Sequence, residues 1–249
     1  MTFALELYAG SMRWAAAAAR AGLAPVLAID IRLGKSHDLG RPGLQAAVLG
    51  WLRAGWVSGL LGGFPCCSWS LARNRPNGPA TLRTAEHVMG LPDRLPHDQA
   101  AIELGNAQVQ FIARVIRACQ AMRTPALFEN PWSSWAWKTS LLIAARSLPG
   151  VRLVRTDQCL WGAPWRKATG LLAVWCDTLP LERVCRTRGV CSRTGKPHEI
   201  LSGKDETGVF KTFRAESYPR PLALAMAQCI RRSRLTLEAE NLGKVFDPV

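Results

Sequence analysis

Short apolar runs alternate with longer amphipathic stretches along most of the chain. The apolar runs are bounded by turn residues and predict β-strands over residues 3–8, 25–30, 57–62, 125–129, 151–156 and 170–175. The stretches between them predict helices over residues 12–21, 43–54, 98–121, 134–146 and 219–232. Strands that alternate with helices in this way favour an α/β fold, with a parallel sheet covered by helices on both faces.

Two segments interrupt this alternation. Residues 71–97 are rich in Pro, Gly, Asn and Arg and predict a long loop, which in a compact domain is usually functional. Residues 177–217 are polar, basic and turn-rich. The chain therefore divides into a core over residues 1–176, a small basic insertion over 177–217, and a closing segment over 218–249 whose helix completes the core.

Composition favours an intracellular, globular protein. A chain of 249 residues can bury a full core as one domain, and 48% of its residues are apolar while 20% are charged. No apolar run reaches the ~20 residues of a membrane span, and residues 1–10 lack the features of a signal peptide. Eight cysteines without framework spacing fit free thiols in a reducing compartment, whether a bacterial or phage-infected cytoplasm or a nucleus. We expect no membrane contact, and a monomer is compatible with the sequence.

The net charge of +14 and the pI of about 10.1 favour a polyanionic partner, because basic residues gain free energy from counterion release at phosphates. Ten tryptophans offer surfaces for stacking on bases, although packing is the commoner use of any one of them. Charge and aromatic content thus indicate nucleic-acid contact without identifying the polymer.

The first two strand ends predict a nucleotide-like ligand. The strand over 3–8 runs into Tyr8, Ala9, Gly10 and Ser11, and the next strand ends at Asp30. Ligands of open α/β sheets bind beyond the carboxyl ends of the strands, where a glycine turn allows close approach and a carboxylate suits ribose hydroxyls. A solvated strand-end acid is the alternative interpretation of Asp30.

A thiol and a carboxyl follow two later strands. Cys66 ends the sequence GGFPC, and Glu129 lies in FENP. A thiol and a carboxyl are the groups needed to attack a flat, electron-poor heterocycle such as cytosine. Cytosine C5 is too weak a nucleophile to take a methyl group directly, so a thiolate must first add at C6 while a positioned acid stabilises charge at N3. Cys66 and Glu129 are the candidates for those two roles. A buried structural cysteine and an acid paired with an arginine are the alternatives.

In order and spacing, these pieces resemble the motifs of the cytosine-C5 DNA methyltransferase family. The matching segments follow the family order from residue 5 to about residue 230: LELYAG, AID, GGFPCCSWS, FENP, DQCLWGAPWRKATGLLAV and ESYPRPLALAMAQCI. The resemblance implies a compact, distant member with a Rossmann-like, S-adenosylmethionine-dependent methyltransferase fold.

The same resemblance implies roles for individual residues. Cys66 would be the nucleophile, Glu129 its acid partner, and Asn130 would hold the loop. Either Arg166 or Lys167 would contact the base. S-adenosylmethionine would bind near Tyr8, Ala9, Gly10, Ser11, Asp30, Asp38, Pro65 and Glu216. The substrate would be a cytosine flipped out of double-stranded DNA.

The chain also departs from the family pattern. Cys67 stands where the family usually has Gln, so the two thiols could exchange roles. Thr169 replaces the second arginine of a Gln-x-Arg-x-Arg motif, and Glu216 stands where Asn is usual. Residues 130–132 (NPW) also resemble the signature of amino-methyltransferases, but they lack its second proline. RNA cytosine-C5 methylation and a catalytically silent nucleic-acid-binding protein of the same fold remain alternatives.

The two irregular segments predict how a nucleic acid is read. The insertion offers basic side chains for a few base contacts: Arg183, Arg186, Arg188, Arg193 and Lys196. The 71–97 loop offers Arg73, Arg75 and Arg83 for phosphate or minor-groove contacts. A recognition region this small predicts a short or relaxed target sequence.

Three residues of the insertion, Cys185, Cys191 and His198, are candidates for a zinc site with a fourth ligand such as Cys176. Their spacing does not match the tight Cys-x₂₋₄-Cys pairs of zinc knuckles. We therefore expect no metal, with ordinary loop cysteines favoured over ligands.

Overall fold

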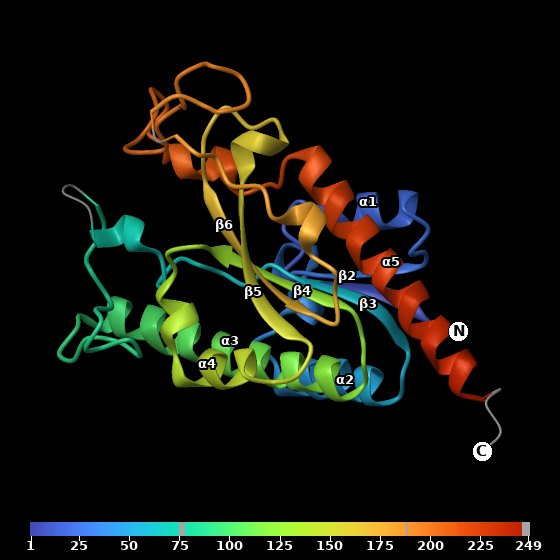
Figure 1. Cartoon of the computed structure of the whole chain (residues 1–249). Coiled ribbons are helices and arrows are strands. Elements are labelled where there is room, and N and C mark those ends of the chain that lie inside the picture. The colour runs from blue at the N-terminus through green and yellow to red at the C-terminus, as the bar shows by residue number, and fades with distance from the viewer. Residues whose placement is uncertain (75–77, 188, 246–249) are drawn as a thin grey trace.

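The computed structural model describes residues 1–74, 78–187 and 189–245. Its centre is a six-stranded sheet with the order β2-β1-β3-β4-β6-β5 (Figure 1). The strands are β1 (Phe3–Leu7), β2 (Val26–Ile29), β3 (Val57–Gly62), β4 (Ala126–Pro131), β5 (Val151–Asp157) and β6 (Ala168–Val174). All six strands expected from the apolar runs are present. The expected fold class, a Rossmann-like α/β sheet with helices on both faces, is confirmed.

One strand runs against the others. The pairs β1–β2, β1–β3 and β3–β4 are parallel, whereas β6 is antiparallel to both β4 and β5. The expectation of an all-parallel sheet was therefore wrong at this edge. The reason lies in the short connection 158–167, because a parallel pair needs a longer crossover than an antiparallel hairpin. The hairpin inserts β6 between β4 and β5 and places residues 158–167 beyond the carboxyl end of β5.

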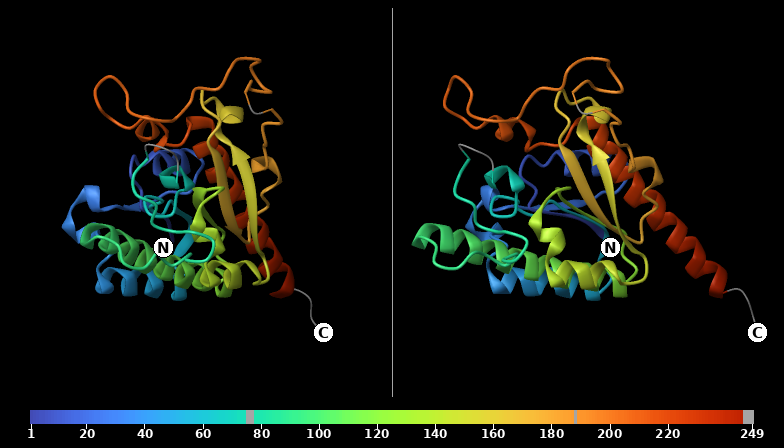
Figure 2. Two further views of the ribbon diagram at one scale, coloured as in Figure 1. Left: turned by 90° about the vertical axis from the view of Figure 1, so that its left-hand side faces the viewer. Right: turned by 60° about the vertical axis from the view of Figure 1, so that its left-hand side comes forward.

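Helices cover both faces of the sheet, in two separate layers (Figures 1 and 2). One layer contains α2 (Pro42–Arg53), α3 (Pro96–Ala121) and α4 (Ser140–Arg146), and the other contains α1 (Arg13–Arg20) and α5 (Arg220–Val245). Successive strand residues alternate between the layers, since Leu60 and Phe128 pack with α2 and α3, whereas Leu61 and Leu127 pack with α1 and α5. This alternation is the two-residue period of a strand buried on both faces.

Two helices differ from the sequence prediction. The helix expected over 134–146 is divided into a 3₁₀ turn, Trp135–Lys138, and α4. Thr139 separates them because its hydroxyl accepts a hydrogen bond from the Leu142 N–H (3.3 Å) and caps α4. Helix α5 continues to Val245, well past residue 232.

Helix α5 approaches strand β3 closely at Gly59. A β-carbon at that position would lie 2.4 Å from Ile230 Cγ2, so the packing of α5 on the sheet depends on the missing side chain.

The two irregular segments lie at the carboxyl-end side of the sheet (Figures 1 and 2). Within their described residues, the 71–97 loop contains a 3₁₀ turn at Leu71–Asn74 before α3 begins at Pro96. The insertion 177–217 contains 3₁₀ turns at Leu179–Leu181 and Lys211–Ala215 and two isolated bridges. In the part of the chain described, no helix is both long and apolar enough to cross a membrane.

Candidate active site

A tight turn presents Cys66 just beyond strand β3. The Cys66 carbonyl accepts hydrogen bonds from the N–H groups of Trp69 (3.0 Å) and Ser70 (2.9 Å), which folds the chain back on itself. Gly63 precedes this turn, and a β-carbon there would lie 2.6 Å from the Tyr218 hydroxyl. Glycine is therefore required for Tyr218 to reach the site. Cys66 is half-buried, whereas Cys67 is exposed.

Glu129 and Asn130 lie at the carboxyl end of the neighbouring strand β4. Asn130 is fully buried, and its side-chain amide donates to the Phe64 carbonyl (2.8 Å), which ties the end of β4 to the Cys66 loop. Glu129 is only 8% exposed. One of its oxygens accepts a hydrogen bond from the Tyr218 hydroxyl (3.3 Å), and the other lies 3.9 Å from Lys167 Nζ.

The charges at this site act on the Cys66 thiol. Burial raises its pKa to about 11, the Lys167 ammonium opposes that rise, and the Glu129 carboxylate and Cys67 add to it. The thiol is therefore within electrostatic reach of both a carboxyl and an ammonium group. The side chains of Cys66, Glu129, Asn130 and Lys167 thus lie near one another at the carboxyl ends of β3 and β4.

Arg166, the other basic candidate, points elsewhere. Its guanidinium donates to Asp157 Oδ2 (3.1 Å) and to the Cys185 carbonyl (2.9 Å). Thr169 is fully buried in β6 and its hydroxyl donates to the Lys167 carbonyl (3.3 Å). Of the basic pair, only Lys167 reaches the Glu129 carboxylate; its ammonium also donates to the Ala215 carbonyl (3.0 Å).

Two site residues were missed in the sequence. Tyr218 is buried, and desolvation followed by the nearby Glu129 charge raises its pKa well above the usual value. Glu6 is 2% exposed and its carboxylate accepts a hydrogen bond from the Ala15 N–H (2.9 Å). Desolvation raises the pKa of Glu6 to about 8; the Ala15 N–H opposes this rise and Asp30 adds to it. A charged residue inside the apolar strand FALEL was the available signal for Glu6.

The loop after β1 has an unusual backbone. Tyr8, Gly10 and Met12 have φ angles of 57°, 49° and 52°, in the left-handed region. The Asp30 carboxylate fixes this loop by accepting hydrogen bonds from the Gly10 N–H (2.8 Å) and the Arg32 N–H (2.9 Å). The glycine turn and the acid at the end of the next strand are thus in direct contact.

The other predicted ligand-binding residues surround this loop. The Tyr8 hydroxyl is buried without a hydrogen-bond partner, and desolvation followed by the charge of Asp38 raises its pKa. Asp38 caps its own turn by accepting from the Gly40 N–H (2.8 Å). Glu216 forms a 2.5 Å salt bridge with Arg32, which connects the end of the 177–217 insertion to the 3₁₀ turn after β2. Three more members of the predicted set, of different accessibility, are Ala9 (buried), Ser11 (exposed) and Pro65 (half-buried).

The prediction that Arg83 contacts phosphate or a minor groove is wrong. Arg83 is 1% exposed, and its guanidinium lies 3.4 Å from the centre of the Trp69 ring. It donates five hydrogen bonds of 2.9–3.1 Å to the Ser68 turn, to its own loop and to α3. Arg73 is largely covered and lies 3.7 Å from Asp98, and Arg75 is outside the described residues.

The basic residues of the insertion are more accessible. Arg183, Arg186, Arg193 and Lys196 are exposed, while Arg188 is outside the described residues. Arg183 lies over the Trp161 ring, 4.1 Å from its centre. These exposed cations remain candidates for contacts with a polyanion.

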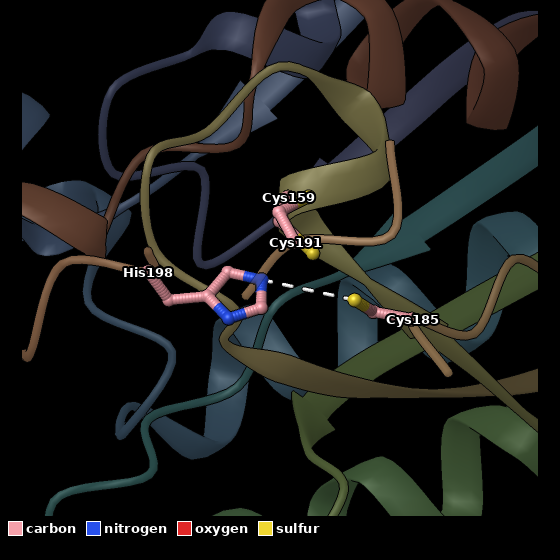
Figure 3. A group of neighbouring side chains, drawn as sticks. All are labelled: Cys159, Cys185, Cys191 and His198. Carbon is pink, nitrogen blue, oxygen red and sulfur yellow. Dashed lines mark hydrogen bonds between the residues drawn. The ribbon is translucent and has the colours of Figure 1, made fainter. Parts of the chain in front are cut away.

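Three sulfurs and an imidazole gather behind this surface (Figure 3). Cys185, Cys191 and His198 come together, and the fourth member of the group is Cys159. The expected fourth residue, Cys176, was wrong: it lies two residues after the end of strand β6 and packs in the α1–α5 layer, and its thiol donates to the Ala126 carbonyl (3.6 Å).

Comparison with known proteins adds little to this geometry. No protein-family model matches the chain, and no curated protein matches it significantly. Among solved structures, the chain is similar to the Entamoeba histolytica methyltransferase EhMeth, with 9% sequence identity, coverage of 95% of this chain and 97% of that one, and a TM-score of 0.43.

Proposed function

We propose that this protein is a methyltransferase that uses S-adenosylmethionine to methylate C5 of cytosine in DNA. The observation that carries the proposal is the convergence of a thiol, a buried carboxyl and an ammonium at the carboxyl ends of β3 and β4. Cys66, Glu129 and Lys167 come from three distant parts of the chain, yet the pKa of the thiol responds to both other groups. Nucleophilic addition to an electron-poor ring needs this combination.

The loop after β1 has the chemistry to hold an adenosine-containing cofactor. The Asp30 carboxylate supplies hydrogen-bond acceptors at a strand end, and the Tyr8 hydroxyl is a buried polar atom without a partner. A β-carbon on Gly10 would meet nothing closer than Arg32 at 3.8 Å, so the turn is open to a ligand. We assign Tyr8, Ala9, Gly10, Ser11 and Asp30 to this site, with Asp38, Pro65 and Glu216 at its rim. S-adenosylmethionine bound there would supply an electrophilic methyl group.

In the proposed reaction, the Cys66 thiolate forms a bond to cytosine C6, and the electrons of the C5–C6 double bond shift into the ring. Glu129 stabilises the resulting charge by donating a proton to N3. C5 then has the nucleophilic character needed to accept a methyl group. A base such as water takes the C5 proton, the sulfur leaves C6 as the free thiolate, and N3 returns its proton to Glu129, which restores the aromatic ring.

The charges around Cys66 suggest how substrate activates it. At neutral pH a thiol with a pKa of about 11 is almost entirely protonated. Because the Glu129 carboxylate raises that pKa, uptake of a solvent proton by Glu129 as the base binds would remove the opposing charge and supply the proton that N3 accepts. The Lys167 ammonium, which lowers the pKa, remains in place. Binding of cytosine therefore favours the thiolate at the moment it is needed.

DNA is the proposed polymer because the chain carries a net charge of +14 and exposes several cations on the insertion. A cytosine in a duplex must be flipped out to reach a thiol that is itself half-buried. The small insertion supports a short or relaxed target sequence rather than a long one.

A covalent trap tests the proposal. The protein is incubated with S-adenosylmethionine and duplex DNA or RNA that contains 5-fluorocytosine, from which the C5 substituent cannot leave. We expect a denaturation-resistant adduct with DNA that is lost in Cys66→Ser and kept in the matched control Cys67→Ser. An adduct with RNA alone would support the RNA enzyme. A protein that binds DNA without an adduct or methyl transfer would be the silent form, and loss of the adduct only in Cys67→Ser would reassign the nucleophile.

A further inference from the structure

The cysteine–histidine group joins two separate parts of the chain. Cys159 lies in the 3₁₀ turn Gln158–Trp161, directly after strand β5, whereas Cys185, Cys191 and His198 belong to the insertion. The three cysteines are 0%, 1% and 4% exposed and form a small cluster of their own. Their sulfurs and a ring nitrogen of His198 all lie within 4.8 Å of one another, and Figure 3 shows the side chains directed toward a common centre.

The distances are close to those of a tetrahedral metal site. With Zn–S bonds of about 2.3 Å and a Zn–N bond of about 2.0–2.1 Å, the edges of a tetrahedron are about 3.6–3.8 Å. The Cys185 sulfur and His198 Nε2 are already 3.7 Å apart. The widest separation, 4.8 Å, requires a shift of about 1 Å, which rotation of cysteine side chains can supply. Three thiolates and one imidazole are a ligand set that selects zinc.

The surroundings of Cys185 also suit a metal-bound thiolate. Its sulfur accepts hydrogen bonds from both the N–H and the hydroxyl of Ser192, each at 3.4 Å. Such bonds orient a ligand and stabilise its negative charge. Cys191 is held by a turn in which its carbonyl accepts from the Gly195 N–H and its N–H donates to the Lys196 carbonyl, each at 2.8 Å.

The insertion buries few apolar side chains. Among its described residues, the buried apolar side chains are Leu181, Cys185, Cys191 and Ala215. Two of these four belong to the cluster. A segment that buries so little apolar surface needs a covalent or metal cross-link to keep one conformation.

We propose that Cys159, Cys185, Cys191 and His198 bind one structural zinc ion, which fastens the 177–217 insertion to the core. Four protein ligands close the coordination sphere, so the role is structural rather than catalytic. This inference is independent of the proposed reaction, because it concerns only the folding of the insertion.

The zinc ion would also stabilise the site next to it. The Cys185 N–H donates to Asp157 Oδ2 (3.0 Å), and the Cys185 carbonyl accepts from Arg166 (2.9 Å). Lys167 follows Arg166 and donates to the Ala215 carbonyl at the far end of the insertion (3.0 Å). A fixed insertion thus helps to hold Lys167 beside Glu129.

Metal analysis of the full chain is the first test. The protein is purified under reducing conditions from cells supplied with zinc, and elemental analysis should give about one zinc per chain. Cys159→Ser and Cys191→Ser should each lose most of it, while Cys67→Ser keeps it. Cobalt exchanged into the parent protein should show the strong visible absorption of a tetrahedral thiolate site. Metal-free protein with free thiols, disulfides within the group, iron in place of zinc, or full zinc content in Cys159→Ser would each overturn the proposal.

A second test does not depend on the folding of variants. The parent protein is treated with a chelator and then with a protease, and cleavage within residues 177–217 is followed by mass spectrometry. We expect cleavage there to become about tenfold faster or more, and to slow again when zinc is restored, because local opening exposes the segment. Cleavage within α3 serves as the internal control and should not change. If zinc removal left the cleavage rate of the insertion unchanged, the ion would not hold the insertion on the core, and the proposal would be wrong.

Discussion

Replacing Arg83 with methionine tests whether a buried guanidinium holds the loop that supports the Cys66 turn. The side chain of Arg83 donates five hydrogen bonds and stacks on Trp69. Two of its acceptors belong to Ser68, two residues after the candidate nucleophile. Burial lowers the pKa of Arg83 to about 10, so the side chain stays charged at neutral pH. Methionine preserves much of the apolar volume but removes every donor.

The expected loss of stability follows from the acceptors left behind. Three of the five hydrogen bonds are fully buried, and the two others lie where water can replace the donor. A buried acceptor without a partner costs roughly 1–2 kcal/mol, so Arg83→Met should lower the free energy of unfolding by roughly 3–6 kcal/mol. For a chain of this size, that corresponds to a fall of roughly 10 °C or more in Tm.

Urea unfolding followed by tryptophan fluorescence measures the change. Arg117→Met is the matched control, because Arg117 is exposed on helix α3 and its replacement should change the free energy of unfolding by less than about 0.5 kcal/mol. Arg83→Met should also make Cys66 more accessible to iodoacetamide, since the turn loses its support. If Arg83→Met unfolded at the same urea concentration as Arg117→Met, the guanidinium would contribute nothing to the loop and the reasoning would fail.

Three further results are expected. Glu129→Gln should lower the pKa of the Cys66 thiol below about 11 and make alkylation of the thiol at pH 8 several-fold faster, while it abolishes methyl transfer. An unchanged alkylation rate would show that the charge of Glu129 does not act on Cys66. Gly59→Ala should destabilise the fold by about 1–3 kcal/mol because the added β-carbon clashes with α5. Gly50→Ala, at an exposed position of α2, should instead stabilise it by about 0.5–1 kcal/mol, and the denaturation midpoints of the two variants give the comparison. Because folding raises the pKa of Glu6 to about 8, the contribution of Glu6 to stability is greatest below pH 4.5 and is lost as the pH rises toward 8. Glu6→Gln should therefore flatten that part of the curve of unfolding free energy against pH. Identical curves for the variant and the parent protein would contradict the burial assigned to Glu6.

The four central strands, β1, β3, β4 and β6, could be read from the sequence because they are buried on both faces and therefore appear as largely apolar runs. The edge strands β2 and β5 are partly exposed, and turn residues at their ends marked them. The direction of β6 could not be read, since direction depends on the length of connection 158–167 and not on the run itself. The role of Thr139 as the cap that divides the expected helix 134–146 could not be predicted either, because a threonine acts as a cap only where its hydroxyl accepts a hydrogen bond from a backbone N–H.

The site shows the same division between local and distant information. Cys66 and Glu129 follow strands whose carboxyl ends meet at one edge, so their proximity could be predicted. Residue type alone could not show which of Arg166 and Lys167 lies beside Glu129. The arginine is held away from Glu129 by its hydrogen bond to the buried carboxylate of Asp157, and that contact is not visible in the sequence. Likewise, an arginine in a polar loop suggests phosphate contact, and only the stacking of Arg83 on an indole revealed a structural role.

The hydrogen bond from Tyr218 to Glu129 has a consequence for the order in which the protein is made. Its two partners are 89 residues apart, so at about 5–20 residues per second the ribosome needs roughly 4–18 s to supply the tyrosine after the carboxyl has been added. During that interval the sheet face later covered by α5 exposes Leu61 and Leu127. The candidate active site therefore cannot be complete until translation has passed Tyr218.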